Sequence, residues 1–251
     1  MIQHLFVLTG ASRGMGLAMA SQLLVPGNTL LCISRTANDK LAAQATEANV
    51  PLLQWTQNLA QGKQASARLS RWLQEQTPHT FASATLINNA GVIPRIGPLS
   101  DADADDLSHA LRVGLEAPMQ MTSAFLRETT CWPGQRKVLN ISSGLGRRAM
   151  ASQAGYCAAK AGMDHFTRCL ALEEALKANG AKVCSLAPGV IDTDMQVQLR
   201  SADSHAFPDQ SSFVNLKNSG ALASPEAAAE RVLAVLARAD FGVSPVADVR
   251  D

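Results

Sequence analysis

Residues 4–16 read HLFVLTGASRGMG, and an apolar segment from Leu17 to about Val25 follows them. Residues 4–8 form a short apolar run that is typical of a buried strand, and the later segment is typical of a helix. A strand, a glycine-rich turn and a helix in this order are the context in which proteins bind a dinucleotide. The order therefore predicts an α/β fold with a phosphate site in the turn.

The glycines of this turn are spaced Gly-x-x-x-Gly-x-Gly. Gly10 permits the tight turn, Gly14 lets the backbone approach a pyrophosphate, and Gly16 allows the helix to pack closely. The exposed amides of the turn and the helix dipole then favour an anion. The predicted cofactor contacts in the turn are Gly10, Ser12, Arg13, Gly14, Met15 and Gly16.

The second predicted strand, residues 29–33, ends in Ser34-Arg35 and so indicates which dinucleotide is bound. A site for NAD usually carries a carboxylate at this strand end, whereas an arginine accommodates the 2′-phosphate of NADP. No acid stands there, and Arg13 could reach the same phosphate with bidentate, charge-assisted contacts. The pattern favours NADP(H) over NAD; the alternative is that both arginines are ordinary surface charges.

Tyr156 and Lys160 stand four residues apart, with Ser143 upstream of them. Four residues is slightly more than one helical turn, so the phenol and the ammonium project from the same helix face. A cation about 4 Å from a phenol is worth roughly 4 kcal/mol at an effective dielectric of about 20, which lowers a phenol pKa of about 10 by roughly three units. Tyr156 would then exchange protons near neutral pH, and Ser143 could hold a carbonyl oxygen beside it. The alternative is a solvated helix face.

Taken in order, these residues resemble the short-chain dehydrogenase/reductase family from about residue 3 to the C-terminus. The resemblance rests on the glycine turn, Asn88-Asn89-Ala90-Gly91 after an apolar strand, Ser143, Tyr156-x3-Lys160, and Pro188-Gly189 followed by Thr193. It implies that Tyr156 is the general acid/base and that Ser143 orients the substrate carbonyl. It also implies that Lys160 lowers the pKa of Tyr156 and binds the nicotinamide ribose.

The resemblance implies further cofactor contacts. Asn89 falls beside the adenine ribose, and Thr193 falls near the nicotinamide carboxamide, with Val190 close to it in the sequence. Asn58-Leu59 stands where the family often has Asp-Leu in contact with the adenine. An amide can still form hydrogen bonds at that position, with a different pattern of donors and acceptors.

Two segments resemble sepiapterin reductases and the related bacterial benzil or diketone reductases more closely. They read ALEE at residues 171–174 and LAPGVIDTDMQ at residues 186–196. The tail VADVRD, residues 246–251, resembles the sepiapterin reductase tail, in which an aspartate anchors the pterin; Asp248 stands in that place. If Asp248 is an anchor, amino-bearing heterocycles are plausible substrates. If it is a solvated carboxylate near the chain end, an apolar dicarbonyl is the better candidate.

One position departs from the family pattern. Gly114 stands where the family normally carries an asparagine, which is credited with holding a water in a proton relay behind the lysine. Glycine has no side chain, and within a helix it costs about 1 kcal/mol relative to alanine. We expect slower turnover rather than loss of activity, because Ser143, Tyr156 and Lys160 remain.

Composition limits the classes of function. The formal net charge of +1 gives no electrostatic case for nucleic acid or an anionic membrane. No apolar run approaches the roughly 20 residues that span a bilayer, and Met1 leads directly into the first strand without room for a signal peptide. The five cysteines lack a Cys-x-x-Cys spacing and are expected to be buried free thiols. The histidines show no ligand spacing, so we assign no metal. Because neither a signal peptide nor a membrane span is predicted, we expect a cytoplasmic protein.

Alternating strands and helices predict a Rossmann-type, doubly wound parallel sheet of about seven strands with helices on both faces, in a single domain over residues 1–251. The other predicted strands are 51–55, 84–88, 137–142, 182–187 and 242–247. Further helices are predicted at 41–48, 65–75, 103–130, 153–179 and 225–239, the last with Ser224 as N-cap. The glycine turn and residues 88–91, 142–143 and 188–193 follow strands, so they converge on one edge of the sheet.

Residues 195–222 form the least regular segment, in which Met195, Leu199, Phe207 and Phe213 interrupt polar residues. The pattern predicts a substrate-covering lid or, alternatively, a loop packed on the body. Leu145 and Met195 are predicted substrate contacts, and Met150 and Val190 are further candidate walls of a mainly apolar pocket.

Trp132, before Pro133-Gly134, is predicted to lie in a surface turn. The helices at 103–130 and 153–179 resemble the family's subunit-pairing helices, which implies a homodimer or homotetramer.

The leading hypothesis is an NADPH-dependent carbonyl reductase that acts on a ketone, a diketone or the side-chain carbonyl of a pterin. Tyr156 would protonate the oxygen, which Ser143 positions. One alternative is a non-catalytic regulatory protein that binds NADPH. This alternative stays open because Gly114 replaces the asparagine of the family's proton relay. Another is a 3-oxoacyl-thioester reductase, which the resemblance of the tail disfavours. All of these hypotheses involve a small molecule, and none involves nucleic acid or a membrane.

Overall fold

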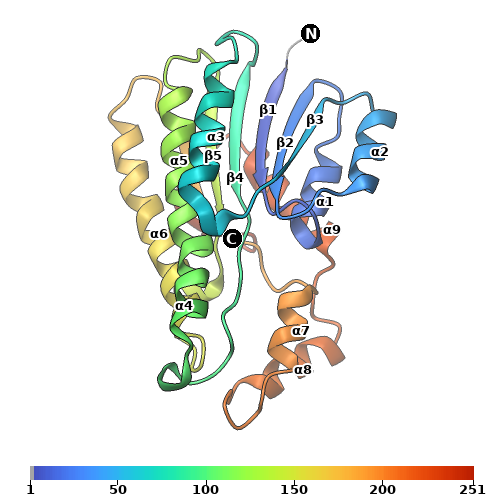
Figure 1. Ribbon diagram of the computed structural model, residues 1–251, viewed down its shortest axis with the longest axis vertical. Helices are drawn as coiled ribbons and strands as arrows, with labels where there is room; N and C mark the ends of the chain where they lie inside the picture. Colours follow the sequence, from blue (N-terminus) through green and yellow to red (C-terminus); the bar gives the residue numbers. More distant parts are fainter. Residues whose placement is uncertain (1–2) are drawn as a thin grey trace.

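The computed structural model describes residues 3–251, which form one parallel sheet with helices on both faces (Figure 1). Met1, which was expected directly before the first strand, lies outside the described residues. The strands are β1 (His4–Thr9), β2 (Asn28–Ser34), β3 (Leu52–Thr56), β4 (Ser83–Asn88), β5 (Gln135–Ile141), β6 (Lys182–Ala187) and β7 (Val246–Asp248). Their order is β3-β2-β1-β4-β5-β6-β7, and each neighbouring pair is parallel. The predicted doubly wound sheet is confirmed.

The two faces of the sheet bury separate hydrophobic cores. One core lies under α1 (Gly14–Gln22), α2 (Asp39–Glu47) and α9 (Pro225–Ala237). The other lies under α3 (Gly62–Gln74), α5 (Ala117–Glu128) and α6 (Ala154–Ala175) (Figure 1). Successive side chains of a strand point to opposite faces, so Leu30 and Leu31 of β2 are both fully buried but belong to different cores. Strands buried on both faces are typical of parallel sheets.

The strand order reverses at β1, which lies between β2 and β4. In open α/β sheets, ligands bind at such a reversal, beyond the carboxyl ends of the strands. The glycine turn follows β1, and Asn89 follows β4. The fold therefore brings these two segments together at the edge where a ligand is expected.

Most predicted elements are confirmed, with shifted ends. Ser224 caps α9 as predicted, since its Oγ accepts a hydrogen bond from the backbone nitrogen of Ala227 at 3.1 Å. The predicted helix 103–130 is divided into α4 (Ala104–Leu111), a π-helical turn at Arg112–Glu116 and α5. The last strand was predicted too early, because Gly242 has a φ of +86° within a turn and pairing begins only at Val246.

Residues 195–222 are more regular than predicted. They include most of α7 (Asp194–Arg200) and all of α8 (Gln210–Asn218), which lie beyond the edge of the sheet (Figure 1). Phe207 and Phe213 are buried and stacked, with ring centroids 5.6 Å apart. Isolated helices this short are marginal in water, so the packing of this small apolar cluster accounts for them.

The prediction for Trp132 was right about the turn and wrong about the surface. The residue follows a turn that begins at Thr129, but its side chain is buried and stacks on Phe81 at a centroid distance of 5.7 Å. The prediction for the cysteines was right in part: all are free, and Cys32 and Cys184 are buried, whereas Cys131 and Cys169 are exposed. Within residues 3–251, no helix is both long and apolar enough to cross a bilayer.

Candidate active site

A cavity of about 860 Å³ lies at the carboxyl edge of the sheet, between the glycine turn and α7. This volume is within the usual range for a small-molecule site. All the residues predicted for cofactor or substrate line it. They are Gly10, Ser12, Arg13, Gly14, Met15, Gly16, Arg35, Asn58, Leu59, Asn89, Ser143, Leu145, Tyr156, Lys160, Val190, Thr193, Met195 and Asp248.

The glycine turn is held in a conformation that side chains would prevent. Gly10 has a φ of +73°, and an added Cβ would lie 2.9 Å from the Cα of Ala90. At Gly16, an added Cβ would lie 2.0 Å from the carbonyl oxygen of Gly10, which agrees with the predicted close packing of the helix. The amide of Asn89 donates to the carbonyl oxygens of Thr9 at 3.0 Å and Gly10 at 3.2 Å. Asn89 therefore fixes the turn, a contact that the sequence did not predict.

This turn fits the phosphates of a dinucleotide. α1 begins at Gly14, so its first backbone amides face the cavity without a side-chain cap. Gly14 has a φ of +55°, and an added Cβ would meet nothing closer than Thr193 Cγ2 at 3.7 Å. The backbone and helix dipole there favour an anion. Together with the residues at the ends of β2 and β3, the turn is the part of the chain that could hold a nicotinamide cofactor.

The two predicted arginines are in different situations. Arg13 forms an exposed ion pair with Asp194 at 2.6 Å, which joins the glycine turn to α7. Arg35 is exposed at the cavity and has no ion-pair partner among the described residues. Next to it, the buried Ser34 hydroxyl lines the cavity and lacks a hydrogen-bond partner. Ser34 was missed from the sequence because serine at a strand end carries no motif.

The adenine end of the predicted site is formed by the segment after β3. Asn58 caps a short 3-10 turn, since its Oδ1 accepts from the backbone nitrogen of Ala60 at 3.0 Å. The amide nitrogen of Asn58 remains available to donate a hydrogen bond to an adenine, as expected from the sequence for an amide at this position. Leu59 is buried and contributes an apolar wall.

The carboxyl end of β5 and the first turns of α6 bring together Ser143, Tyr156 and Lys160. Lys160 Nζ lies 5.7 Å from the centre of the Tyr156 ring, so the two side chains share a helix face as predicted. Nζ donates a hydrogen bond to the carbonyl oxygen of Ile141 at 2.7 Å. Ser143 Oγ accepts from the backbone nitrogen of Leu145 at 3.2 Å, which orients the hydroxyl at the head of a short 3-10 turn.

The expected lowering of the tyrosine pKa is wrong for this geometry. Burial raises the pKa of Tyr156, a hydrogen bond with Ser143 acts in the opposite direction, and the neighbouring Cys157 also raises it. Burial also lowers the pKa of Lys160 to about 8, against a smaller upward effect of Asp164. The phenol is therefore protonated at neutral pH, which is the state of a proton donor.

Gly114 lies in the π-helical turn, opposite α6. An added Cβ would lie 3.2 Å from the Cβ of Ala159, the residue before Lys160. The absent side chain therefore lets the turn pack tightly on α6, the helix that carries Tyr156 and Lys160. This contact gives a structural reason for glycine that the sequence did not suggest.

At the substrate end, Leu145, Met150, Met195 and Phe213 provide apolar walls. Asp248 also lines the cavity, but its carboxylate is held by its neighbour: Arg250 Nε donates to Oδ1 at 2.7 Å and Arg250 Nη2 to Oδ2 at 2.6 Å. These hydrogen bonds lower the pKa of Asp248.

Two polar residues at this end were not predicted from the sequence. Arg250 is one, since nothing in the sequence distinguishes it from a free terminal arginine. Gln153 is the other: it is 2% exposed, and neither its amide oxygen nor its amide nitrogen has a partner. It precedes Tyr156 by three residues, so helix spacing could have indicated it. Among residues 3–251, no three candidate metal ligands gather at a point.

The family model of short chain dehydrogenases matches residues 4–204. The chain belongs to the short-chain dehydrogenase/reductase family. Among relatives of this short-chain dehydrogenase/reductase is the benzil reductase ((S)-benzoin forming) of Bacillus cereus, 34% identical, with 94% of each chain covered. Another is the sepiapterin reductase of Mus musculus, 32% identical, with 94% of this chain and 92% of the relative covered.

A solved structure from Agrobacterium tumefaciens, provisionally named a 2-deoxy-d-gluconate 3-dehydrogenase and containing bound NADP, superposes with a TM-score of 0.80. It is 26% identical, and the alignment covers 99% of this chain and 95% of that chain. As a short-chain dehydrogenase/reductase, the protein is an oxidoreductase that acts on CH–OH or C=O groups of small molecules with a nicotinamide cofactor.

Proposed function

We propose that this protein is an NADPH-dependent carbonyl reductase whose preferred substrates are apolar 1,2-diketones. The observation that carries the proposal is the convergence, in one cavity, of the glycine turn, Arg35 and the group Ser143, Tyr156 and Lys160. Apolar side chains, those of Leu145, Met150, Met195 and Phe213, line the substrate end of the same cavity.

The chain's own residues account for the proton chemistry. When bound, NADPH supplies the hydride that reduces the carbonyl carbon. Ser143 donates a hydrogen bond to the carbonyl oxygen and fixes its position. Tyr156 transfers its phenol proton to that oxygen, so the tyrosine O–H bond breaks as the alcohol O–H bond forms. The charge of Lys160 stabilises the phenolate until solvent returns a proton.

The preference for NADPH over NADH rests on charge at the end of β2. Arg35 is free to bind a 2′-phosphate, and the residues that line the cavity at this strand end, Ile33, Ser34 and Arg35, include no acid that would favour a ribose hydroxyl. The Arg13–Asp194 pair is exposed at both ends and so is weak enough for Arg13 to turn toward the same phosphate.

The preference for a diketone rests on the state of Asp248. In a sepiapterin reductase-like role, its carboxylate would accept hydrogen bonds from an amino-bearing heterocycle. Arg250 already occupies both oxygens of that carboxylate. A pterin would have to displace the guanidinium, whereas an apolar diketone needs only the walls that Leu145, Met195 and Phe213 provide. The benzil reductase relative supports the same class of substrate.

We further propose that the chain is a single domain in which α7 and α8 act as the lid over the substrate. Ile93 and Met150 pack against Leu199 of α7, Phe213 of α8 and Phe207 between the two helices, so closure would bury an existing apolar surface. Met119 on α5, Leu172 on α6 and Leu176 at the C-cap of α6 are exposed, which supports pairing with a second copy of the chain as a homodimer or homotetramer. Its free cysteines suit a reducing compartment such as the cytoplasm.

The test is a panel of carbonyl compounds with NADPH and NADH. We expect oxidation of NADPH with benzil and 1-phenyl-1,2-propanedione, slower oxidation with sepiapterin and with 3-oxoacyl thioesters, and weak activity with NADH. In Tyr156→Phe, turnover should be lost while the dissociation constant for NADPH is retained. If the wild-type protein binds NADPH but reduces none of these compounds, the non-catalytic alternative is favoured.

A further inference from the structure

We propose that Asp164 is a positioning residue for carbonyl reduction: a buried carboxylate that holds the catalytic turn Ser142–Arg147 against α6 and links it to the C-terminal strand. The proposal rests on the reductase function proposed above. Asp164 follows Lys160 by one helical turn and is 1% exposed.

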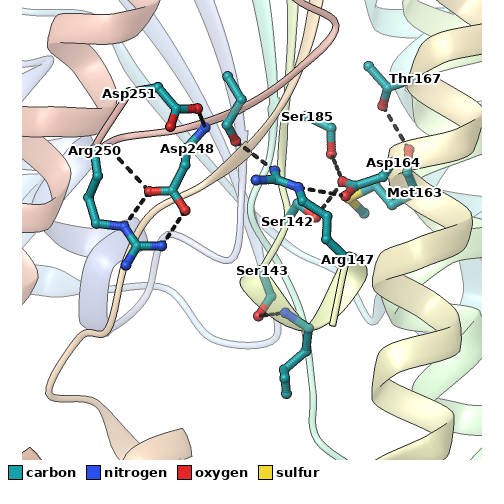
Figure 2. A network of polar contacts seen from close by, with 12 residues as sticks. Ser142, Ser143, Arg147, Met163, Asp164, Thr167, Ser185, Asp248, Arg250 and Asp251 are labelled. Atoms are coloured by element: carbon teal, nitrogen blue, oxygen red, sulfur yellow. Dashed lines mark hydrogen bonds and ion pairs between the residues drawn. The ribbon is translucent and has the colours of Figure 1, made fainter. Parts of the chain in front are cut away.

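Three donors from two segments, the turn and β6, converge on this carboxylate (Figure 2). Oδ1 accepts hydrogen bonds from Ser142 Oγ at 2.5 Å and from Ser185 Oγ of β6 at 2.6 Å. Oδ2 accepts from Arg147 Nε at 3.3 Å. A buried carboxylate without partners would be very costly, so its position strongly restrains the donors around it.

Two of these donors lie at the two ends of the turn that carries Ser143. Ser142 precedes Ser143, and Arg147 follows the short 3-10 turn that Ser143 caps. Gly146 packs directly on the carboxylate, since an added Cβ would lie 2.9 Å from Asp164 Oδ2. Asp164 therefore fixes where the Ser143 hydroxyl stands relative to the phenol of Tyr156.

The same network extends to the substrate end of the cavity. Arg147 Nη2 donates to the carbonyl oxygen of Ala247 in β7 at 2.7 Å. The next residue, Asp248, lines the cavity with Arg250. Figure 2 shows the guanidinium of Arg250 against the carboxylate of Asp248. One carboxylate on α6 thus connects the catalytic helix, the catalytic turn and the C-terminal wall.

The charge of Asp164 has a separate effect from its contacts. Titratable and charged groups face it from each element packed around it: Lys160 on α6, Arg147 from the turn and Cys184 from β6. Its negative charge raises the pKa of Lys160 and so opposes the effect of burial. Loss of this charge should therefore release the lysine proton at lower pH.

Ser142→Ala and Ser185→Ala form a matched pair for the test, because each removes one hydroxyl donor from the same oxygen of Asp164. Only Ser142 adjoins Ser143. We expect kcat for benzil reduction to fall roughly tenfold in Ser142→Ala, below the roughly hundredfold cost of a 1 Å misplacement. Ser185→Ala should change kcat little. Equal losses in the two variants would overturn the proposal.

A spectroscopic measurement gives a result that does not depend on activity. Tyr156 is the only tyrosine in the sequence, so tyrosinate absorbance at 295 nm, measured after rapid pH jumps, reports its titration alone. A shifted turn loses the hydrogen bond from Ser143 that lowers this pKa. The midpoint should therefore rise in Ser142→Ala and stay in place in Ser185→Ala. Identical midpoints in both variants would refute the positioning role even if no substrate were found.

Asp164→Asn removes the negative charge of the carboxylate but keeps the size of the side chain, so it tests the effect of the charge. We expect a loss of kcat at least as large as in Ser142→Ala, with the alkaline limb of the kcat/KM profile moved to lower pH. The limb should not move in Ser142→Ala, which keeps the carboxylate. An unmoved limb in Asp164→Asn, with a normal melting temperature and NADPH dissociation constant, would overturn the role of the charge. A wild-type protein that reduces no carbonyl compound would refute the proposed function instead, and the tyrosine titration would still decide the proposal.

Discussion

The ammonium of Lys160 lies 5.7 Å from the centre of the Tyr156 ring and donates its hydrogen bond to the backbone carbonyl of Ile141. The lysine therefore places a charge near the phenol without forming a direct ion pair with it. Desolvation outweighs the other influences on the phenol and raises its pKa. The arrangement keeps the tyrosine protonated, which suits reduction of a carbonyl better than oxidation of an alcohol.

The first prediction concerns this pKa directly. In the protein without added cofactor, the tyrosinate signal at 295 nm should titrate above the ordinary value of about 10. The raised pKa means that the phenol stays protonated throughout the neutral range and loses its proton only at high pH. Tyr156→Phe provides the blank, since it removes the only tyrosine. A midpoint near 7 would instead support the lowering that the Tyr-x3-Lys spacing predicted.

The second prediction concerns the pH dependence of reduction. Burial lowers the pKa of Lys160 to about 8, so the ammonium is present below that pH and is lost as the pH rises through it. Because the charge stabilises the phenolate formed by proton transfer, kcat/KM should fall above about pH 8. The profile of kcat/KM reports the free enzyme, so it is the appropriate measurement. A profile that stays flat to pH 9.5 would contradict this role of the charge.

These features differ in how far the sequence could predict them. The glycine turn and the Tyr156–Lys160 pair depend on spacing within one turn or one helix, so local periodicity was sufficient. Asp164 could not be found in this way, because its partners Ser142, Arg147 and Ser185 lie outside α6, in the turn after β5 and in β6. The pKa of the phenol also depends on burial, which the spacing of two residues does not contain.

The same distinction explains the errors in the fold. The turn near Trp132 was readable from Pro133-Gly134, but the burial of the indole depends on Phe81, which lies on another segment. The helices α7 and α8 are short and owe their stability to the apolar cluster of Leu199, Phe207 and Phe213. Local propensity predicted neither outcome, since both are consequences of tertiary packing.

The third prediction concerns cofactor choice. Arg35→Ala should raise the KM for NADPH roughly 10- to 100-fold, because a charge-assisted hydrogen bond contributes about 1.5–3 kcal/mol. The KM for NADH should change little, since NADH has no phosphate at that position. Arg71→Ala is a suitable control, because Arg71 is exposed on α3 away from the cavity. Equal effects on both cofactors would show that Arg35 does not recognise the phosphate.

The fourth prediction concerns substrate choice. Arg250→Ala should free the carboxylate of Asp248, whose pKa would rise toward its ordinary value as the guanidinium is lost. Activity with sepiapterin should then increase relative to activity with benzil. When Asp248→Asn is added to Arg250→Ala, the gain in sepiapterin activity should disappear, while benzil reduction should remain nearly unchanged. If Arg250→Ala lowers both activities equally, the pair is a structural clamp on the tail rather than a determinant of specificity.

The fifth prediction concerns Gly114. In Gly114→Asn, the new Cβ would lie 3.2 Å from the Cβ of Ala159, which is tighter than an ordinary contact. Overpacking of this kind costs typically 1–3 kcal/mol, and for a chain of this size each 1 kcal/mol lowers Tm by about 2–4 °C. The single variant should therefore melt several degrees lower, and Ala159→Gly in the same chain should recover part of the loss. If the family's asparagine completes a proton relay, kcat of the double variant should exceed that of Ala159→Gly alone. The absence of any gain in kcat would mean that the π-helical turn and the backbone already complete the relay without that side chain.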